Sequence, residues 1–191
     1  MKKKELTAIK QTRLNALLDE ATKCLVENPS ASMNEIAESA GIGIATLHRY
    51  VESREQLMIH LGFRAIEVVT ATMNDIKLDD ERYESYIPEL IEALIPLGDK
   101  IYFLSHDATV NSNKDIEEQD RALRKPLLRA IELLQQKGYF RQDADKNWIV
   151  EVLYSLVFLT WQQVVEGNVA RNSAAQLLVD TFYRGFRQNE S

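Results

Sequence analysis

Residues 32–54 constrain the fold of this chain more than any other segment, because they read as two short helices joined by a tight turn. Ser32 and Glu35 have the spacing at which a serine hydroxyl and a glutamate carboxylate cap a helix start reciprocally. The small side chain of Ala37 allows two helices to cross closely, and Gly41 can adopt the positive φ that ends a helix. The segment therefore predicts a helix-turn-helix motif.

The second helix of this motif is expected over residues 44–51. Helical spacing places Ile44, Leu47 and either Tyr50 or Val51 on its inner side. The outward side chains are Ala45, Thr46, His48 and Arg49. In a helix-turn-helix the second helix lies in the major groove of double-stranded DNA, where arginine is the side chain best suited to guanine. Arg49 is therefore the leading candidate for a base contact.

The alternative is that these two helices are ordinary parts of an all-α core. Three features argue against this alternative. They are the capping pattern at Ser32, the small residue four positions before the turn glycine, and a further cap at Ser53 with Gln56 behind it. We therefore predict a DNA-binding surface made by the two helices and the residues that flank them. Its members are Ser32, Asn34, Gly43, Ala45, Thr46, His48, Arg49, Tyr50 and Arg54.

Residues 13–58 closely resemble the DNA-binding domain of the tetracycline-repressor (TetR/AcrR) family of bacterial transcription regulators. The matching residues are the first-helix run Leu14, Leu17, Leu18, Ala21 and Leu25, then Ile36-Ala37, Ala40-Gly41-Ile42, Thr46-Leu47, Tyr50-Val51, Ser53-Arg54-Glu55 and Leu57. The chain departs from the family pattern at Gly43, Ala45, His48 and Arg54, where the family usually carries serine, glycine or proline, tyrosine and lysine. These departures concern base and phosphate contacts, not the fold.

Long helical patterns without strand signals fill the rest of the chain, which predicts an all-α fold. We expect two domains: an N-terminal three-helix helix-turn-helix domain over residues 1–54, and a C-terminal helical ligand-binding and dimerisation domain over residues 55–191. A fourth helix from Ser53 links them. Further helices are expected over 81–94, 96–104, 115–136, 145–166 and 173–188.

The charge is distributed unevenly between the two predicted domains. The chain carries a net charge of −6, yet residues 1–54 hold eight Lys and Arg against seven Asp and Glu. Attraction to DNA phosphates must then come from local placement of cations instead of a globally positive field. The candidates are Lys2, Lys3, Lys4, Lys10, Arg49 and Arg54.

The segment 148–165 leaves hardly any polar side, so we expect a helix buried all round, covered partly by its own subunit and partly by a second one. The resemblance implies the same, because TetR-family members usually dimerise through the last two long helices of each subunit. A two-fold homodimer implies a roughly palindromic operator. The predicted interface comprises Leu153, Val157, Trp161, Leu178, Phe182 and Phe186. The alternative is a monomer with a large interior.

The resemblance also implies that a small-molecule effector binds in the second domain and changes the separation of the two DNA-binding heads. The candidate pocket residues are Tyr86, Phe103, His106, Arg129, Tyr154, Phe158 and Trp161. An aromatic stripe at helical spacing is also typical of plain core packing. The sequence does not identify the effector.

Enzymatic and metal-binding functions find no support in the spacing of the polar residues. The chain has no glycine-rich phosphate loop, no Gly-x-Ser-x-Gly and no paired histidines on one helix face, and Cys24 is its only cysteine. We expect no catalytic residues, metal or cofactor, no membrane segment and a cytoplasmic location.

The resulting hypothesis is a ligand-responsive transcriptional regulator that represses by binding a palindromic operator as a homodimer and leaves it when an effector binds. A helical dimeric ligand-binding or interaction module with weakened DNA recognition remains the alternative, because of Gly43, Ala45 and His48.

Overall fold

The computed structural model describes residues 2–79 and 81–188, with the side chains of residues 9–79, 81–104 and 107–188. It is all-α, as the sequence predicts; within the described residues there is no strand, and one isolated bridge pairs Phe140 with Arg187. The helices are α1 (Lys2–Glu27), α2 (Met33–Ser39), α3 (Ile44–Leu47), α4 (Arg54–Met73), α5 (Tyr83–Leu94), the 3-10 turn η1 (Ile95–Leu97), α6 (Gly98–His106), α7 (Ala108–Ser112), α8 (Lys114–Gln136), α9 (Lys146–Val165) and α10 (Arg171–Phe186).

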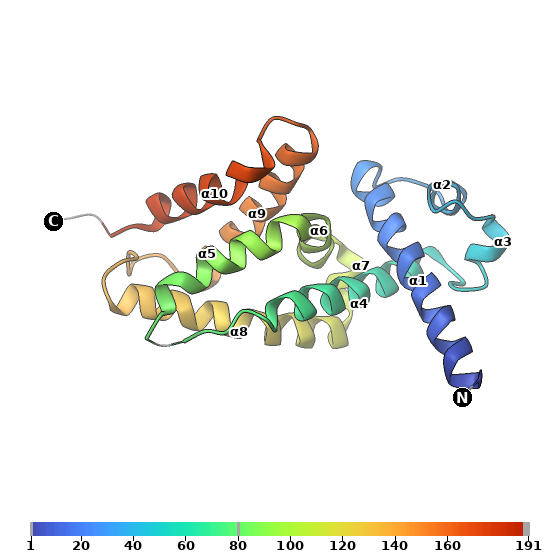
Figure 1. Ribbon diagram of the computed structural model, residues 1–191, viewed down its shortest axis with the longest axis horizontal. Coiled ribbons are helices and arrows are strands. Elements are labelled where there is room, and N and C mark those ends of the chain that lie inside the picture. The colour runs from blue at the N-terminus through green and yellow to red at the C-terminus, as the bar shows by residue number, and fades with distance from the viewer. Residues whose placement is uncertain (1, 80, 189–191) are drawn as a thin grey trace.

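The helices gather at two ends of an elongated molecule. Figure 1 shows α1, α2 and α3 at one end, α5 and α8–α10 at the other, and α4 running from the first group along the second. We call α1–α3 with the start of α4 the head, and the remaining helices the body. The long helices predicted for the body correspond to α5, α8, α9 and α10, with ends shifted by one or two residues.

Two hydrophobic cores stabilise the molecule, and α4 contributes to both. Leu57, Met58 and Leu61 from its first half pack with the buried residues of α1, α2 and α3. Ala65 and Val69 from its second half pack into the body core. The head core also takes Phe103 from α6, so apolar contact continues across the predicted boundary at residue 54. The division into two domains stays a prediction.

A buried polar network joins the head to the body. Lys100 of α6 places its ammonium 2.7 Å from the carboxylate of Asp99 and 3.7 Å from that of Asp19 on α1. Arg64 of α4 donates to the same Asp19 carboxylate at 3.0 and 3.3 Å. Because Asp99 and Lys100 are buried, their charges depend on one another for compensation. The network therefore ties α1, α4 and α6 together.

The helix α9 is apolar, but the chain itself does not bury it all round. That a second copy of the chain covers the remaining side stays a prediction. Ile149, Leu153 and Val157 are fully buried, whereas Trp148 is 62% exposed and Leu159 is 49% exposed. Length and composition alone would allow α9, the one such helix in the described part of the chain, to cross a membrane; core helices pass that test too. Here α9 packs against α6, α8 and α10.

Candidate nucleic-acid interface and ligand cavities

The start of α2 has the reciprocal cap that the sequence predicts. The Ser32 amide donates to the Glu35 carboxylate at 2.7 Å, and the Glu35 amide donates to the Ser32 hydroxyl at 3.3 Å. The bonds from Ser32 hold the pKa of the Glu35 carboxyl below its usual range. After α2, Gly41 adopts a φ of +67°, which ends the helix and turns the chain toward α3. The cap therefore fixes where α2 begins, and the turn at Gly41 separates α2 from α3.

The helix α3 is shorter than expected, because it covers Ile44–Leu47 instead of residues 44–51. Beyond it the chain stays coiled but tightens, since the amides of Arg49 and Tyr50 donate three residues back, to Thr46 and Leu47. The inner side chains are Leu47 and Val51, both fully buried, while Tyr50 is half-buried.

The polar side of this motif faces outward as predicted. Ala45, His48 and Arg49 are exposed and Thr46 is half-exposed. Ser32, Asn34 and Gly43 are exposed near the starts of α2 and α3. The structure therefore places these candidate DNA contacts on one motif, although their contact with DNA stays a prediction.

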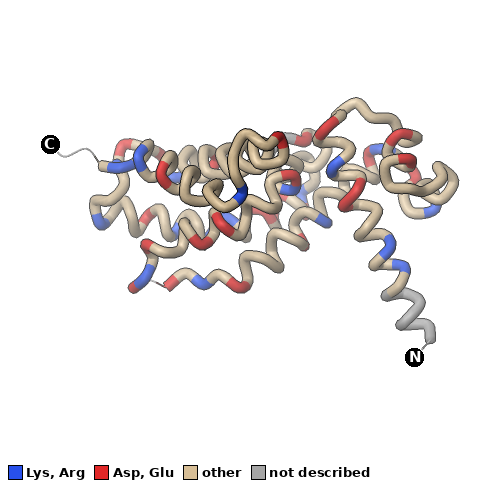
Figure 2. Tube along the Cα trace, turned by 45° about the horizontal axis from the view of Figure 1, so that its top comes forward, with Lys and Arg blue, Asp and Glu red and all other residues tan. Residues whose placement is uncertain are grey.

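A groove beside α3 is lined by three cationic side chains, two of which the sequence predicts as phosphate contacts. A cavity of about 270 Å³ between α1 and the end of the motif is lined by Ile9, Lys10, Arg13, Arg49 and Tyr50. Figure 2 shows basic residues along the described part of α1 that leads away from the body. Lys10 and Arg49 are among the predicted phosphate contacts. Arg13 is not, although its spacing from Lys10 places both on one helical face. The side chains of Lys2, Lys3 and Lys4 lie outside those described.

Arg54 has an internal role that the sequence analysis did not predict. Its guanidinium donates to the Pro29 carbonyl at 2.7 Å and also to the Ala31 carbonyl. Arg54 thereby ties the start of α4 to the loop between α1 and α2. The side chain is half-buried and turned toward the backbone of its own head, so its contact with a DNA phosphate stays a prediction that competes with this internal role.

Two of the seven predicted pocket residues, Tyr86 and Phe103, line different cavities. Tyr86 lines a body cavity of about 350 Å³, whereas Phe103 lines a different cavity of about 480 Å³ where the head meets the body. Phe158 stacks between Trp161, with ring centroids 5.8 Å apart, and Tyr102, at 4.7 Å. These half-buried rings pack between α6 and α9. His106 ends α6, but its side chain is outside the described set.

The remaining two predicted pocket residues, Tyr154 of α9 and Arg129 of α8, lie beside charged side chains of α8. The Tyr154 ring is buried beneath the Arg124 guanidinium, 4.9 Å from its centroid, and burial raises the pKa of the Tyr154 hydroxyl. Arg124 also pairs with Asp120 at 2.6 Å; desolvation nevertheless raises the pKa of that carboxyl. Arg129 is exposed and lies 3.9 Å from Glu132.

The body cavity that contains Tyr86 lies between α4, α5 and α8. Its lining combines apolar and polar side chains: Ile66, Thr70, Met73, Asn74, Ile76, Tyr86, Gln119, Ala122, Leu123 and Pro126. Burial raises the pKa of the Tyr86 hydroxyl to about 12, so this group is a neutral donor at physiological pH. A cavity of this size and lining suits a small organic molecule.

Five of the six predicted interface residues lie on the inner sides of their helices, and their part in a dimer interface stays a prediction. Leu153, Val157, Leu178, Phe182 and Phe186 are covered by the subunit's own core. The helical periodicity of the sequence identifies the apolar residues of α9 and α10. Which side of each helix stays exposed depends on how the helix packs against its neighbours in the chain. Trp161, the sixth, is half-buried and packs on Gly98, where a Cβ would lie 2.3 Å from that of Trp161.

Comparisons with known proteins agree with this fold. The chain matches no protein-family model. The HTH-type transcriptional repressor LfrR of Mycolicibacterium smegmatis is 22% identical over 167 residues, 85% of this chain and 84% of LfrR. The HTH-type transcriptional regulator NfxB of Pseudomonas aeruginosa is 26% identical over 165 residues, 84% of this chain and 87% of NfxB.

A solved structure extends the likeness to three dimensions. The TetR-like transcriptional regulator LfrR from Mycobacterium smegmatis, in complex with proflavine, superposes with a TM-score of 0.70 at 18% identity, over 93% of this chain and 99% of that chain. The homologues are transcriptional regulators, not enzymes. The resemblance to TetR-type regulators predicted from residues 13–58 is thus confirmed. Among the described residues, no cluster of three or more His, Cys, Asp or Glu side chains could hold a metal ion.

Proposed function

We propose that this chain, whose fold is that of the TetR-like transcriptional regulators, is a homodimeric repressor that binds a palindromic operator and leaves it when a small-molecule effector binds. The observation that carries the proposal is the outward face of the capped helix-turn-helix, where Ala45, His48 and Arg49 are exposed beside a buried Leu47. The similarity to a named repressor, LfrR, supports repression.

DNA recognition in this proposal divides between α3 and the cationic groove. The exposed residues of α3 and of the turn that follows it enter the major groove, where Thr46 and Arg49 reach base edges. Lys10 and Arg13 line the groove that also holds Arg49, so they contact the phosphates that flank the base contacts. The three cations thus concentrate positive charge at this groove, although the chain as a whole carries a net charge of −6.

Dimerisation uses the sides of α9 and α10 that the subunit leaves open. On α9, Trp148, Val152 and Leu159 share one side of the helix, turned away from Leu153. On α10, Leu177 is 52% exposed. Because α9 and α10 pack against each other, these apolar side chains belong to neighbouring helices. Two copies joined there would present two α3 helices with two-fold symmetry.

The effector site of this proposal is the body cavity lined by Tyr86. Ile66 and Met73, which line it, belong to α4, the helix whose first half packs in the head core. An effector that binds better when α4 is displaced shifts the population toward a different head spacing. The cytoplasm is the location in which such a regulator acts.

The proposal is tested by selecting bound duplexes from a randomised DNA pool at about 0.15 M salt, where non-specific phosphate binding is weakened. The purified chain is first shown to be a folded dimer, and the variant Lys10→Ala/Arg13→Ala/Arg49→Ala serves as the control. We expect the wild type to enrich a two-fold-symmetric sequence and the variant to enrich none.

One observation favours the alternative, a dimeric ligand-binding or interaction module with weakened DNA recognition. The helix α3 has only four residues and presents the small Ala45 where a longer side chain would reach further. If a folded dimer enriches no sequence, the repressor proposal fails and this alternative replaces it.

A further inference from the structure

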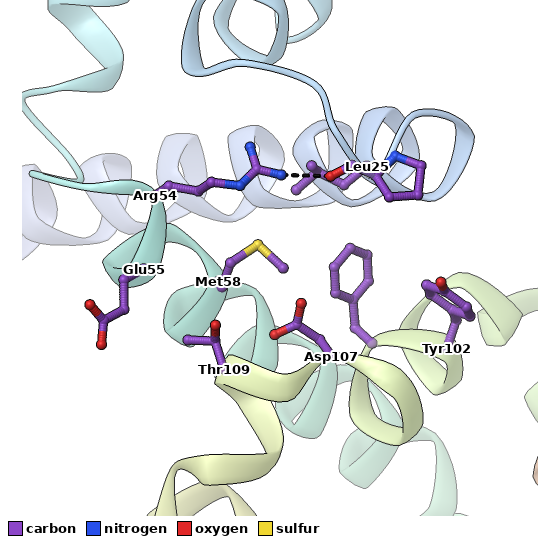
Figure 3. A pocket seen from close by; sticks show the side chains of 9 residues that line it. Leu25, Arg54, Glu55, Met58, Tyr102, Asp107 and Thr109 are labelled. Atoms are coloured by element: carbon purple, nitrogen blue, oxygen red, sulfur yellow. Dashed lines mark hydrogen bonds between the residues drawn. The ribbon is translucent and has the colours of Figure 1, made fainter.

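One side chain joins the two ends of the predicted DNA-binding segment, residues 32–53. Arg54 is the first residue of α4, directly after that segment, and its two terminal nitrogens donate to the carbonyl oxygens of Pro29, at 2.7 Å, and of Ala31. Pro29 and Ala31 lie in the loop directly before Ser32, the cap of α2. Figure 3 shows the Arg54 side chain extended from the start of α4, with its bond to Pro29 dashed. We call these two hydrogen bonds the Arg54 clasp.

The clasp pairs two carbonyl groups of the loop before α2. Within the described residues, no backbone amide donates to the carbonyl of Pro29 or of Ala31. Ala31 is 1% exposed, and an unpaired carbonyl is costly at a buried residue. The other bonds of the loop are local: the Ala31 amide donates to the Asn28 carbonyl at 3.0 Å, and the Asn28 side chain accepts from Ser30. These local bonds shape the turn, whereas the clasp joins it to α4.

The α4 side of the clasp is held in place by its own cap. Ser53 accepts from the Gln56 amide at 3.1 Å, and the Gln56 side chain accepts from the Glu52 amide at 2.5 Å. The guanidinium is planar and donates along two directions at once, so it holds the loop at a set orientation as well as at a set distance. Arg54 thereby closes residues 32–53, which carry α2 and α3, into a ring.

A closed segment presents its outward side chains in fewer orientations than an open one, because joining its ends removes conformations. The side chains concerned include Thr46 and Arg49, the proposed base contacts. A surface that is ordered before it binds loses less conformational entropy on binding. Base reading needs hydrogen-bond geometry, whereas attraction to phosphates acts over about 8 Å at physiological salt. Loss of the clasp should therefore weaken base reading more than phosphate attraction.

The competing role of Arg54 is the phosphate contact that the sequence predicts. A guanidinium that turned to a phosphate would give up both carbonyls, one of them on the buried Ala31. Arg54 is half-buried, whereas Lys10 and Arg13 line the groove beside α3 and are exposed or half-exposed there. The geometry thus favours an internal role for Arg54.

We infer that Arg54 is a positioning residue for base reading: its clasp holds α2 and α3 in the orientation that DNA requires, and the phosphate contacts are left to Lys10 and Arg13. The inference rests on the proposed function, because it takes residues 32–53 to bind DNA. The clasp itself can be measured without DNA.

Hydrogen exchange of the full chain without DNA tests whether the clasp holds the loop. Arg54→Met keeps the aliphatic stem and removes the donors. We expect the amides of residues 28–36 to exchange about tenfold faster in this variant, whereas those of α8 and α9 keep their rates. Arg82→Met, which removes an exposed arginine ahead of α5, is the matched control and should change neither. Unchanged exchange of residues 28–36 in Arg54→Met overturns the inference.

DNA titrations separate positioning from phosphate contact. Fluorescence anisotropy compares the duplex selected from the randomised pool with the same duplex with both half-sites scrambled, over a series of salt concentrations. In Arg13→Met we expect both affinities to fall by a similar factor, and the slope of log affinity against log salt to fall by about one per subunit. In Arg54→Met we expect the preference for the selected duplex to fall about tenfold at an unchanged slope. Either an unchanged preference or a slope lower by about one per subunit in Arg54→Met overturns the inference.

Arg54→Lys keeps the charge but not the geometry. Lysine is a point charge that can replace arginine at a phosphate, but it lacks the planar fork that reaches two carbonyls. We expect the preference for the selected duplex to stay about threefold or more below that of the wild type. Full recovery of the preference by lysine overturns the inference. Thermal unfolding verifies that each variant is folded, and Arg54→Lys takes the place of Arg54→Met in the exchange experiment if the latter is not.

The inference and the operator proposal fail in different ways. A chain that selects no duplex refutes the operator proposal, and the positioning of base contacts falls with it, even where exchange shows that the clasp holds the loop. A chain that selects a duplex but keeps its full preference in Arg54→Met refutes the positioning role alone.

Discussion

Lys100→Met tests whether the buried network between α1, α4 and α6 stabilises the molecule. The Lys100 and Asp99 side chains are only 10% and 6% exposed, and their charged atoms are 2.7 Å apart. Methionine retains most of the aliphatic packing of lysine but leaves the carboxylate of Asp99 buried without its partner. The substitution therefore removes the partner of Asp99, while Asp19, which Lys100 also approaches, keeps its pair with Arg64.

Removing one partner of a buried ion pair costs about 3–5 kcal/mol. We expect the lower end, about 3 kcal/mol, because Asp99 keeps the hydrogen bond at 2.9 Å from the backbone amide of residue 100. With a urea slope of about 2 kcal/mol/M, the unfolding midpoint should fall by about 1.5 M. Equilibrium urea unfolding followed by circular dichroism measures this shift.

Two further variants control the experiment. Lys125→Met removes an exposed lysine from α8 and should change the free energy of unfolding by less than about 0.5 kcal/mol. Asp99→Asn/Lys100→Met removes both charges and should recover at least about 1 kcal/mol of the single variant's loss. A loss below about 1 kcal/mol for Lys100→Met, or a double variant no more stable than the single one, would refute the reasoning.

Three other predictions concern packing, pH and DNA affinity. A Cβ at Gly98 would lie 2.3 Å from that of Trp161, so Gly98→Ala should cost about 2 kcal/mol; an unchanged melting temperature would contradict the close α6–α9 contact. Backbone amide bonds lower the pKa of the Asp145 carboxyl that caps α9, so its contribution is present above the unfolded pKa and is lost as pH falls through the folded one. Asp145→Asn keeps the cap, so melting scans between about pH 5 and about pH 3 should show a smaller acid-induced loss than in the wild type; an equal loss speaks against this carboxylate. Arg13→Ala should reduce the slope of log affinity against log salt by about one per subunit in DNA titrations, and an unaltered slope would remove Arg13 from the phosphate contacts.

Local features of the fold could be predicted from the sequence. The cap of Ser32 and Glu35 and the turn at Gly41 involve residues a few positions apart, so neighbouring side chains and the backbone determine them. The end of α3 was less predictable. Beyond Leu47 the backbone hydrogen bonds span three residues instead of the four of an α-helix, and the apolar pattern of the sequence is the same for both.

Contacts between residues far apart in the chain could not be predicted from the sequence. Arg54 binds carbonyl groups 23 and 25 residues away, which no periodicity reveals. Leu153 and Leu159 are equally apolar, yet the first is buried and the second is half-exposed, because packing against neighbouring helices selects one side of α9. The candidate pocket aromatics lie at different places in the structure for the same reason. Their spacing in the sequence predicts which face of a helix they share, but not which cavity that face lines.

The measurement that tests the central claim most directly is the affinity of the wild type and of Arg49→Ala for the selected duplex and for the same duplex with both half-sites scrambled. Fluorescence anisotropy at about 0.15 M salt gives all four values. We expect the wild type to prefer the selected duplex by at least about a thousandfold, and Arg49→Ala to lose about tenfold or more of that preference. Equal wild-type affinity for both duplexes would contradict sequence-specific DNA binding by this chain.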